Sequence, residues 1–301
     1  MYRIKRNQII YAMSALNQPV QRVEDGATVL FETCDCFENQ IKSTDTDFET
    51  LDWNRINPAT GPVYVQGAQP GDILKVTIEK IGIADHGVMM TGPDVGMIGD
   101  RLTQNAIRLI PIRDSKAVYE GKVELPLKPM IGVIGTAPAG DPVSCGTPGE
   151  HGGNMDCTII GEGTTLYLPV NVPGALLAMG DLHAVMGDGE VSVCGLEVQG
   201  EVTVTVSVLK DCQLPLPLAK TAFSVYVIAS ANTLDEAVLD ATRNLVDLLT
   251  TMTHGTFNEY DAINLLSLAG NLQVCQVVDP LKTVRFELNL HYLKQLGITL
   301  E

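Results

Sequence analysis

The stretch EVTVTVSVL (residues 201–209) alternates valine with glutamate, threonine or serine at every second position. Side chains of an extended strand point alternately to opposite faces, so this pattern predicts a strand with one apolar and one polar face. The stretch ends a longer segment, 189–209, that is rich in β-branched residues, and other such segments, separated by Gly, Pro or Asp clusters, lie at residues 28–37, 71–84, 106–114, 122–138 and 163–172. Because no helical periodicity intervenes, residues 1–230 are predicted to form an antiparallel sandwich or barrel.

The C-terminal part of the chain changes character. Residues 232–252 open with Thr233-Leu-Asp-Glu236, a capping-box pattern, and carry apolar residues at helical spacing. A second helix is expected over 258–270, and strands are expected over 272–280 and 284–293. We therefore expect a β-rich part over residues 1–212 that carries the active site, with a smaller α+β layer over 213–301 packed against it.

Charge and composition exclude several classes of protein. Lys and Arg total 20 against 36 Asp and Glu, which gives a formal charge of −16 and argues against nucleic acid as a partner. No run of about 18 apolar residues is present, so no membrane-spanning segment is predicted. The seven cysteines are scattered and the N-terminus lacks a secretory pattern, which favours reduced thiols and a cytoplasmic location.

Two Gly-flanked polar clusters stand out in a chain with only five histidines. GEHGGNMD (149–156) and GDLHAVMGDGEV (180–191) together hold Glu150, His151, Asn154, Asp156, Asp181, His183, Asp188 and Glu190. In an extended segment Asp181 and His183 point to the same face, so both can reach one divalent cation such as Zn²⁺. His151 is a candidate for a further ligand. A plain surface turn at Asp188-Gly189 is the competing interpretation.

Two further side chains have open interpretations. Glu190 is a candidate general base or a partner for a metal ligand, and its spacing alone slightly favours the alternative of a solvated carboxylate at the start of a strand. Cys145 precedes His151 by six residues, so a cysteine nucleophile with a histidine base is conceivable. A buried, unreactive thiol is the competing interpretation of Cys145, because a nucleophile needs a lowered pKa.

Several long motifs carry a family resemblance. They are DCF (35–37), WNRINPATGPVYVQGAQPGDILKVTI (53–78), GEHGGNMD, GDLHAVMGDGEV and LAGNLQVCQVVDP (268–280). With these motifs in order along nearly its full length, the chain resembles the acetamidase/formamidase family. The resemblance implies a mainly β fold, a jelly-roll-like antiparallel sandwich with a β-barrel-like part and a smaller C-terminal α+β part. It also implies a homodimer or larger homo-oligomer, associated metal ions, and hydrolysis of short linear amides to a carboxylate and ammonia.

The resemblance also transfers a set of polar residues. The family's motif positions fall on Asp35, His151, Asn154, Asp156, Asp181, His183, Asp188 and Glu190. The chain departs from the family pattern where it has Asn271 in place of an expected Asp, and Gln66 and Gln69 in place of expected Glu residues. These departures cast doubt on any role for those three positions.

The hypothesis from the sequence is metal-assisted amide hydrolysis. The expected cofactor is a divalent ion, Zn²⁺ first and Ca²⁺ as the alternative, with candidate ligands Asp181, His183, His151, Asp35, Asp156 and Glu150. The candidate catalytic residues are Glu190 for proton transfer, Asn154 for the oxyanion together with backbone N–H groups of Gly152 and Gly153, and Asp188. The alternatives are a metal-free amidase that uses Cys145, and a non-catalytic family member that binds a small molecule or a metal.

Overall fold

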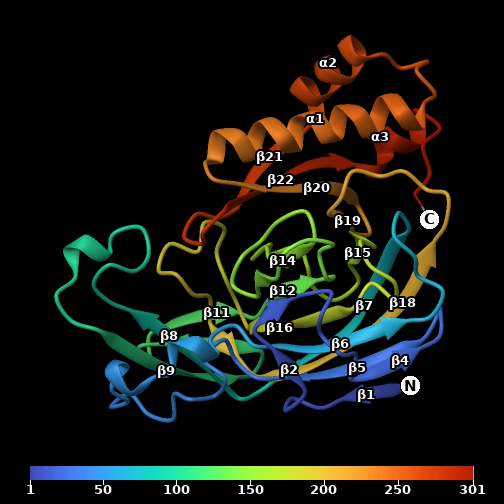
Figure 1. Cartoon of the computed structure of the whole chain (residues 1–301). Coiled ribbons are helices and arrows are strands. Elements are labelled where there is room, and N and C mark those ends of the chain that lie inside the picture. Colours follow the sequence, from blue (N-terminus) through green and yellow to red (C-terminus); the bar gives the residue numbers. More distant parts are fainter. Residues whose placement is uncertain (301) are drawn as a thin grey trace.

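A computed structural model describes residues 1–300, and its strands form three sheets (Figure 1). The nine-stranded sheet has, in spatial order, β1 (Tyr2–Ile4), β5 (Thr28–Thr33), β18 (Gly200–Leu209), β7 (Ile73–Ile83), β15 (Thr165–Pro169), β19 (Leu218–Lys220), β20 (Ser224–Ala231), β22 (Lys282–Asn289) and β21 (Asn271–Gln276). This sheet runs from the N-terminus into the C-terminal region without a break.

The eleven-stranded sheet packs against the first one. Its main path is β11 (Val123–Pro126), β10 (Lys116–Tyr119), β9 (Ala106–Arg113), β8 (His86–Thr91), β17 (Glu197–Val198), β16 (Leu177–His183), β12 (Met130–Gly135) and β14 (Gly152–Asn154). Three more strands lie off this path: β6 (Ala59–Val65) pairs with β16, and both β2 (Ile9–Ile10) and β4 (Gln21–Val23) pair with β6. A small third sheet pairs β3 (Ala12–Met13) with β13 (Val143–Ser144).

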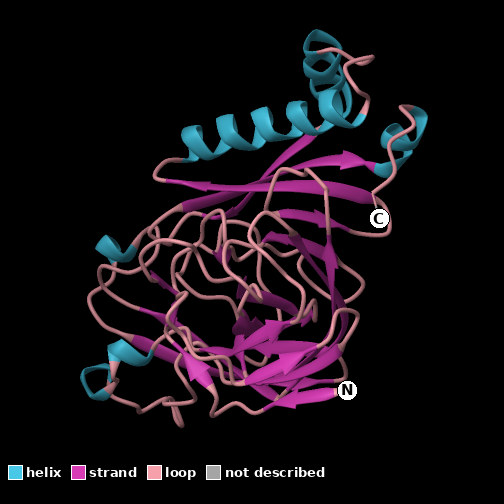
Figure 2. Cartoon of the chain, turned by 45° about the vertical axis from the view of Figure 1, so that its right-hand side comes forward, coloured by secondary structure: helices cyan, strands magenta, loops and turns pink. Residues whose placement is uncertain are grey.

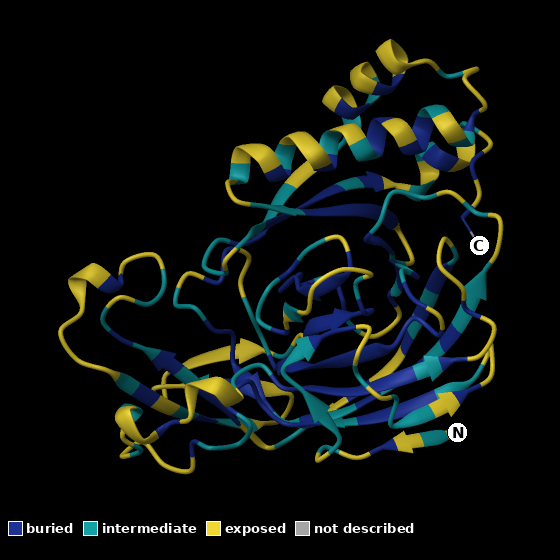
Figure 3. Ribbon diagram, in the orientation of Figure 1, coloured by how far each residue is buried: buried dark blue, intermediate teal, exposed yellow. Residues whose placement is uncertain are grey.

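Most strand pairs are antiparallel, which confirms the predicted mainly β fold; β1–β5 and β4–β6 are parallel. The alternation in residues 201–209 behaves as expected, since Val202, Val204 and Val206 are fully buried in β18 while the residues between them are only partly buried. These valines belong to the large apolar core that both sheets share. Figure 3 shows the strands around this core as buried.

The C-terminal layer places helices on the outer face of β20 and β22 (Figure 2). Helix α1 (Leu234–Met252) begins with the predicted capping box between Thr233 and Glu236. It buries one apolar stripe in a second core with α2 (Glu259–Ala269) and α3 (Leu290–Gln295), while its other face is exposed (Figure 3). Short 3₁₀ turns lie at Phe48–Thr50, Trp53–Arg55 and Gly99–Arg101.

Some predicted boundaries were wrong. The strand expected over 284–293 ends at Asn289, whose side chain accepts a hydrogen bond from the His291 N–H and thereby starts α3. The segments 122–138 and 189–209 each divide into two strands, because Gly and Pro residues interrupt them. The division at 212/213 stays a prediction, and the nine-stranded sheet passes across it. Within residues 1–300 no helix has the length and apolar character needed to cross a membrane.

Candidate active site

His183 lies among four buried carboxyl groups. Its Nε2 atom is 3.1 Å from Glu197 Oε1, 3.4 Å from Asp181 Oδ1, 3.7 Å from Asp156 Oδ1 and 3.9 Å from Glu190 Oε1. Each of these five side chains belongs to a residue that is at most 6% exposed. We call them the carboxylate–imidazole cluster. Buried ionisable groups are costly without partners, so such a concentration indicates a functional site.

Three strands bring the cluster together. Asp181 and His183 share one face of β16, as the sequence predicts, and Glu197 of β17 pairs directly with His183 across the ladder. Asp156 follows β14, which is held against β12. Gly132 of β12 lies opposite Asp181, where the absence of a side chain leaves room for the carboxylates.

The backbone is unusual at three of the carboxylates. Asp156, Asp181 and Glu190 have φ angles of 43°, 55° and 47°, in the left-handed region that residues other than glycine rarely adopt. Such conformations cost on the order of 1–3 kcal/mol each and collect at functional sites, where the surrounding fold enforces them. Here they turn three carboxylates from different segments toward one imidazole.

Burial and mutual repulsion shift the acid–base properties of the cluster. Burial, followed by the neighbouring Asp279 charge, raises the pKa of Asp156 well above its usual range. Burial and the charge of Asp156 likewise raise the pKa of Glu190. For His183, burial alone would lower the pKa, but the charges of Glu197 and Asp181 raise it well above the ordinary value. A carboxyl with a raised pKa is suited to exchange protons near neutral pH.

The cluster lies at one wall of a cavity of about 260 Å³. Polar lining residues include Asn154, Asp156, Asp181, Glu190, Glu197 and Asp279, and apolar ones include Phe37, Trp53, Ile56, Met90, Val95 and Val193. This volume is below the range of about 300–1,000 Å³ that is typical of sites for drug-sized ligands. The cavity therefore suits a small molecule with one polar and one apolar end.

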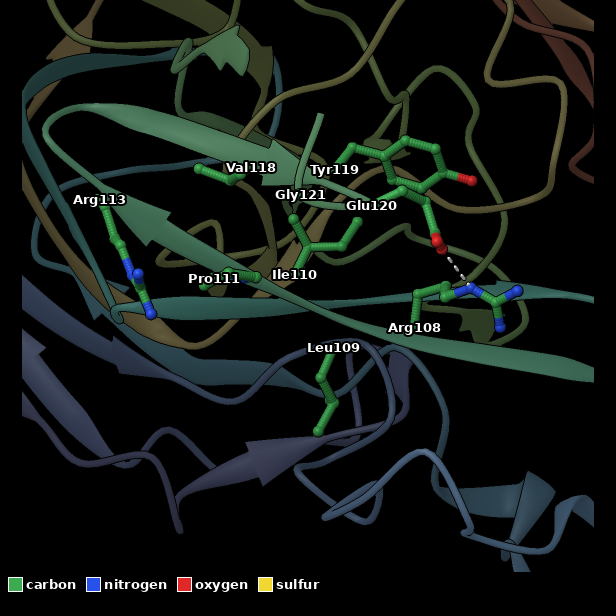
Figure 4. A pocket seen from close by; sticks show the side chains of 9 residues that line it. All are labelled: Arg108, Leu109, Ile110, Pro111, Arg113, Val118, Tyr119, Glu120 and Gly121. Carbon is green, nitrogen blue, oxygen red and sulfur yellow. Dashed lines mark hydrogen bonds and ion pairs between the residues drawn. The ribbon is translucent and has the colours of Figure 1, made fainter. Parts of the chain in front are cut away.

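A second hollow provides a contrast (Figure 4). It lies on the β9–β10 hairpin, and the ion pair between Arg108 Nε and Glu120 Oε1, 2.8 Å apart, spans one side of it. Its charged groups are exposed, and Glu120 is the one carboxylate in its lining. The hairpin hollow therefore has none of the buried, convergent chemistry of the cluster.

Five of the predicted site residues lie outside the cluster, and one of them, Asn154, lines the cavity beside it. Glu150 is exposed, and Asp188 forms an ion pair with Arg285 Nη2 at 2.6 Å. Asp35 is buried, but its Oδ1 accepts hydrogen bonds from the N–H groups of Phe37 and Asn39 and so closes a turn.

His151 is also outside the cluster. It is buried against Gly149 and Gly153, and it forms no ion pair with a carboxylate of residues 1–300. The bridge between Gly149 and Gly152 holds the turn at residues 149–153, and the Nε2 atom of His151 is buried there without a hydrogen-bond partner.

Sequence reasoning missed three contributors. Glu197 is the first residue of β17 and lies between the buried residues Leu196 and Val198, and a carboxylate between buried apolar residues was the available signal. Asp279 follows β21 in the C-terminal layer and accepts a hydrogen bond of 2.9 Å from Asn154 Nδ2. It lies in the motif LAGNLQVCQVVDP, which carried the resemblance. Cys36 lies with Asp181 and Glu197 in a group whose ligand atoms are within 4.8 Å of one another.

The cluster has the donors that a divalent cation needs. Asp156 Oδ1 and Asp181 Oδ1 are buried without hydrogen-bond partners, and both face His183 Nε2. Ligands about 2.1 Å from one tetrahedral ion are separated by about 3.4 Å. His183 Nε2 lies 3.4 Å from Asp181 Oδ1 and 3.7 Å from Asp156 Oδ1, close to that separation. Asp156, His183 and Glu190 form a second group with ligand atoms within 4.8 Å. Oxygen and imidazole donors in this arrangement fit a divalent metal.

Fold and cluster together define a mainly β protein with a buried carboxylate–imidazole centre. Comparison with known families then gives the assignment: the model of the acetamidase/formamidase family matches residues 17–144 and 140–280, and the chain belongs to this family. The sequence resemblance is thereby confirmed.

Solved structures and curated relatives that resemble the chain are named as acetamidases and formamidases. An acetamidase from Bacillus halodurans superposes with a TM-score of 0.96 at 48% identity, over 98% of this chain and 100% of that one. A protein from Thermoanaerobacter tengcongensis described as a predicted acetamidase/formamidase has a TM-score of 0.96 at 47% identity, over 99% of both chains. A formamidase of Methylophilus methylotrophus is 26% identical over 64% of this chain, and the match spans 62% of that relative.

Proposed function

We propose that this protein hydrolyses short linear amides of the formamide and acetamide type to a carboxylate and ammonia, with the help of a divalent metal ion. The carboxylate–imidazole cluster in its small cavity is the observation that carries this proposal. Family membership supports the same chemistry, since relatives are named formamidase and acetamidase.

Asp156, Asp181 and His183 are the residues proposed to hold the ion, which would polarise the amide carbonyl and make water more acidic. Zn²⁺ suits the mixed oxygen and nitrogen donors, and Ca²⁺ is the alternative. Of the sequence candidates, His151, Asp35 and Glu150 lack support from the geometry of the cluster.

Glu190 is the proposed proton carrier. Its carboxylate lies 3.9 Å from His183 Nε2 and lines the cavity, so it can take the proton of an attacking water. It then delivers that proton to the amide nitrogen as the carbon–nitrogen bond breaks, since the leaving group departs readily only when protonated. Burial raises the pKa of Glu190, which makes its carboxylate a stronger base for the proton of the attacking water.

Asn154 and the apolar wall account for substrate placement. The Asn154 amide donates one hydrogen bond to Asp279, and its other N–H is proposed to reach the carbonyl oxygen of the substrate. The N–H of Gly152 already donates to Gly149 at 3.1 Å, which weakens its candidacy for the oxyanion. Phe37 and Trp53 on the apolar wall suit a small acyl group.

Both alternatives lose support. The Cys145 thiol is fully buried, and burial raises its pKa to about 12, whereas a nucleophilic cysteine needs a lowered pKa. The departures at Asn271, Gln66 and Gln69 lend some support to the non-catalytic alternative, but all three residues are exposed and outside the cavity lining.

The decisive experiment measures ammonia release from formamide, acetamide, propionamide and butyramide. We expect the shorter amides to be turned over by the native protein, and Glu190→Gln to lower kcat by about 10²–10⁴-fold. Glu120→Gln, on the hairpin hollow, is the control and should match the native protein. No turnover of any amide by metal-loaded native protein would refute the proposed function. A homodimer or larger assembly and a cytoplasmic location stay predictions, the first of which size-exclusion chromatography tests.

A further inference from the structure

Arg285 is a buried arginine on strand β22 whose guanidinium lies next to the active site without lining its cavity. The residue is 4% exposed, and a buried arginine requires partners for its N–H donors. Nε donates to Gln273 Oε1 at 2.5 Å, which anchors the side chain to the neighbouring strand β21. Nη1 also donates to Cys275 Sγ on β21 at 3.8 Å, and the other contacts of Nη1 and Nη2 are with residues outside the C-terminal layer.

Those donors reach two segments that carry cluster residues. Nη1 and Nη2 donate to the two carboxylate oxygens of Asp188 at 3.0 and 2.6 Å, a paired arrangement that a lysine cannot reproduce. Nη1 also donates to Thr158 Oγ1 at 3.2 Å, and Thr158 donates to Asp188 Oδ1 at 2.8 Å. Asp188 and Thr158 are therefore joined both directly and through one guanidinium.

Asp188 and Thr158, the partners of Arg285, are close in sequence to two carboxylates of the cluster. Asp188 precedes Glu190 by two residues, and Thr158 follows Asp156 by two residues. Glu190 and Asp156 both have left-handed backbone conformations, which the surrounding contacts must enforce. A link between their two segments sets the spacing between the two carboxylates.

Strand β21 supports the same loop through its backbone. The N–H of Gly189 donates to the carbonyl of Cys275 at 2.8 Å, and the N–H of Val277 donates to the carbonyl of Gly189 at 3.2 Å. These bonds hold the loop to the layer from which Arg285 projects. The guanidinium then adds a directional constraint on the side chain of Asp188.

We propose that Arg285 is a positioning residue: by clamping Asp188 and Thr158, its guanidinium holds Glu190 and Asp156 in the geometry that the reaction needs. Asp188 lies in the turn that its sequence suggests, since the N–H of Glu190 donates to the carbonyl of Gly187 at 3.2 Å. The role of its side chain is then to receive this clamp, which differs from the catalytic role that the sequence suggests. The kinetic test of this inference rests on the proposed function, because it measures turnover of an amide. The metal-binding test does not depend on turnover.

The kinetic test compares Arg285→Lys, Arg285→Met and Asp188→Asn with the native protein. Because displacements near 1 Å cost about 10²-fold in rate, we expect Arg285→Met to lower kcat by about 10²-fold with KM within threefold. Arg285→Lys should recover part of the loss, since it keeps the charge without the paired donors. The double variant Arg285→Met/Asp188→Asn should be no slower than Arg285→Met, because both changes remove one link. Arg108→Met, in the ion pair of Figure 4, is the matched control and should retain native kcat.

The second test titrates Zn²⁺ into metal-stripped protein by calorimetry. We expect Arg285→Met to bind Zn²⁺ at least tenfold more weakly than the native protein, and Arg108→Met to bind it equally well. If Arg285→Met fails to fold, Arg285→Lys and Asp188→Asn carry both tests. Native kcat and native Zn²⁺ affinity in the folded variants would overturn the inference. A native protein that binds Zn²⁺ but releases no ammonia would refute the proposed function alone, and the Zn²⁺ comparison would still decide the role of Arg285.

Discussion

Gly132 is the position where adding a single methyl group should damage the active site most selectively. A Cβ built on Gly132 would lie 2.8 Å from Asp181 Oδ2 and 2.9 Å from the Asp181 carbonyl oxygen, with Asp156 Oδ1 closer still. Ordinary contact begins near 3.4 Å, so the Asp181 carboxylate must retreat by about 0.6 Å and that of Asp156 by about 1 Å. Since a displacement near 1 Å costs about 10²-fold in rate, Gly132→Ala should lower kcat/KM by about that factor, or about 2.7 kcal/mol.

The assay is ammonia release from formamide and acetamide, with metal content and thermal unfolding measured on the same preparations. Overpacking also destabilises by about 1–3 kcal/mol, so the loss of rate needs two controls. A Cβ added at Gly270 would lie 2.6 Å from the Phe286 ring and 2.7 Å from the Leu266 carbonyl oxygen, in the C-terminal layer. Gly270→Ala should therefore lose stability but keep its kcat/KM. Gly82→Ala has its nearest neighbouring atom at 4.0 Å and should match the native protein in both. A folded Gly132→Ala variant with kcat/KM within threefold of native would refute this reasoning.

Three further predictions follow from the cluster and its surroundings. The His183→Ala variant should lose the bound divalent metal and at least 10²-fold in kcat, because the imidazole is the shared neighbour of all four carboxylates. Dialysis of the native protein against a chelator should have the same two effects. Full metal content of the variant in elemental analysis would contradict this prediction. Cys145→Ser should keep kcat/KM within about threefold, and iodoacetamide should label the native thiol slowly, because burial raises its pKa to about 12; rapid inactivation on labelling of Cys145 would count against it. Burial lowers the pKa of His151 to about 4 in the folded protein, against about 6.5 when unfolded. Between these two pKa values the unfolded chain therefore binds a proton at His151 that the folded protein does not bind. The contribution of His151 to the free energy of unfolding, which is fully present above pH 6.5, should fall by about 2–3 kcal/mol on acidification to pH 4.5. Urea unfolding should show this loss in the native protein and not in a folded His151→Gln variant.

The sequence predicts much of the fold because its signals are local. Alternation at every second residue predicts β18, and the capping box at Thr233 predicts the start of α1. The same period of two places Asp181 and His183 on one face of β16. These features depend on backbone geometry over a few residues, so no knowledge of distant contacts is needed.

The rest of the site depends on which segments meet. Glu197 reaches His183 because of the register between β16 and β17, and Asp279 arrives from the C-terminal layer, nearly a hundred residues further along the chain. Asp188 and Glu190 have the same spacing as Asp181 and His183. Yet Asp188 binds Arg285 outside the cavity, whereas Glu190 belongs to the cluster.

What the sequence determined by itself was the β-rich architecture, the helical layer, the family, and the pair of side chains that share a strand. The tertiary structure alone decided which carboxylates surround His183, and that Arg285 is the partner of Asp188. The physical reason is that strand periodicity is a short-range property of the backbone, whereas strand register and left-handed turns are enforced by packing between segments far apart in the chain.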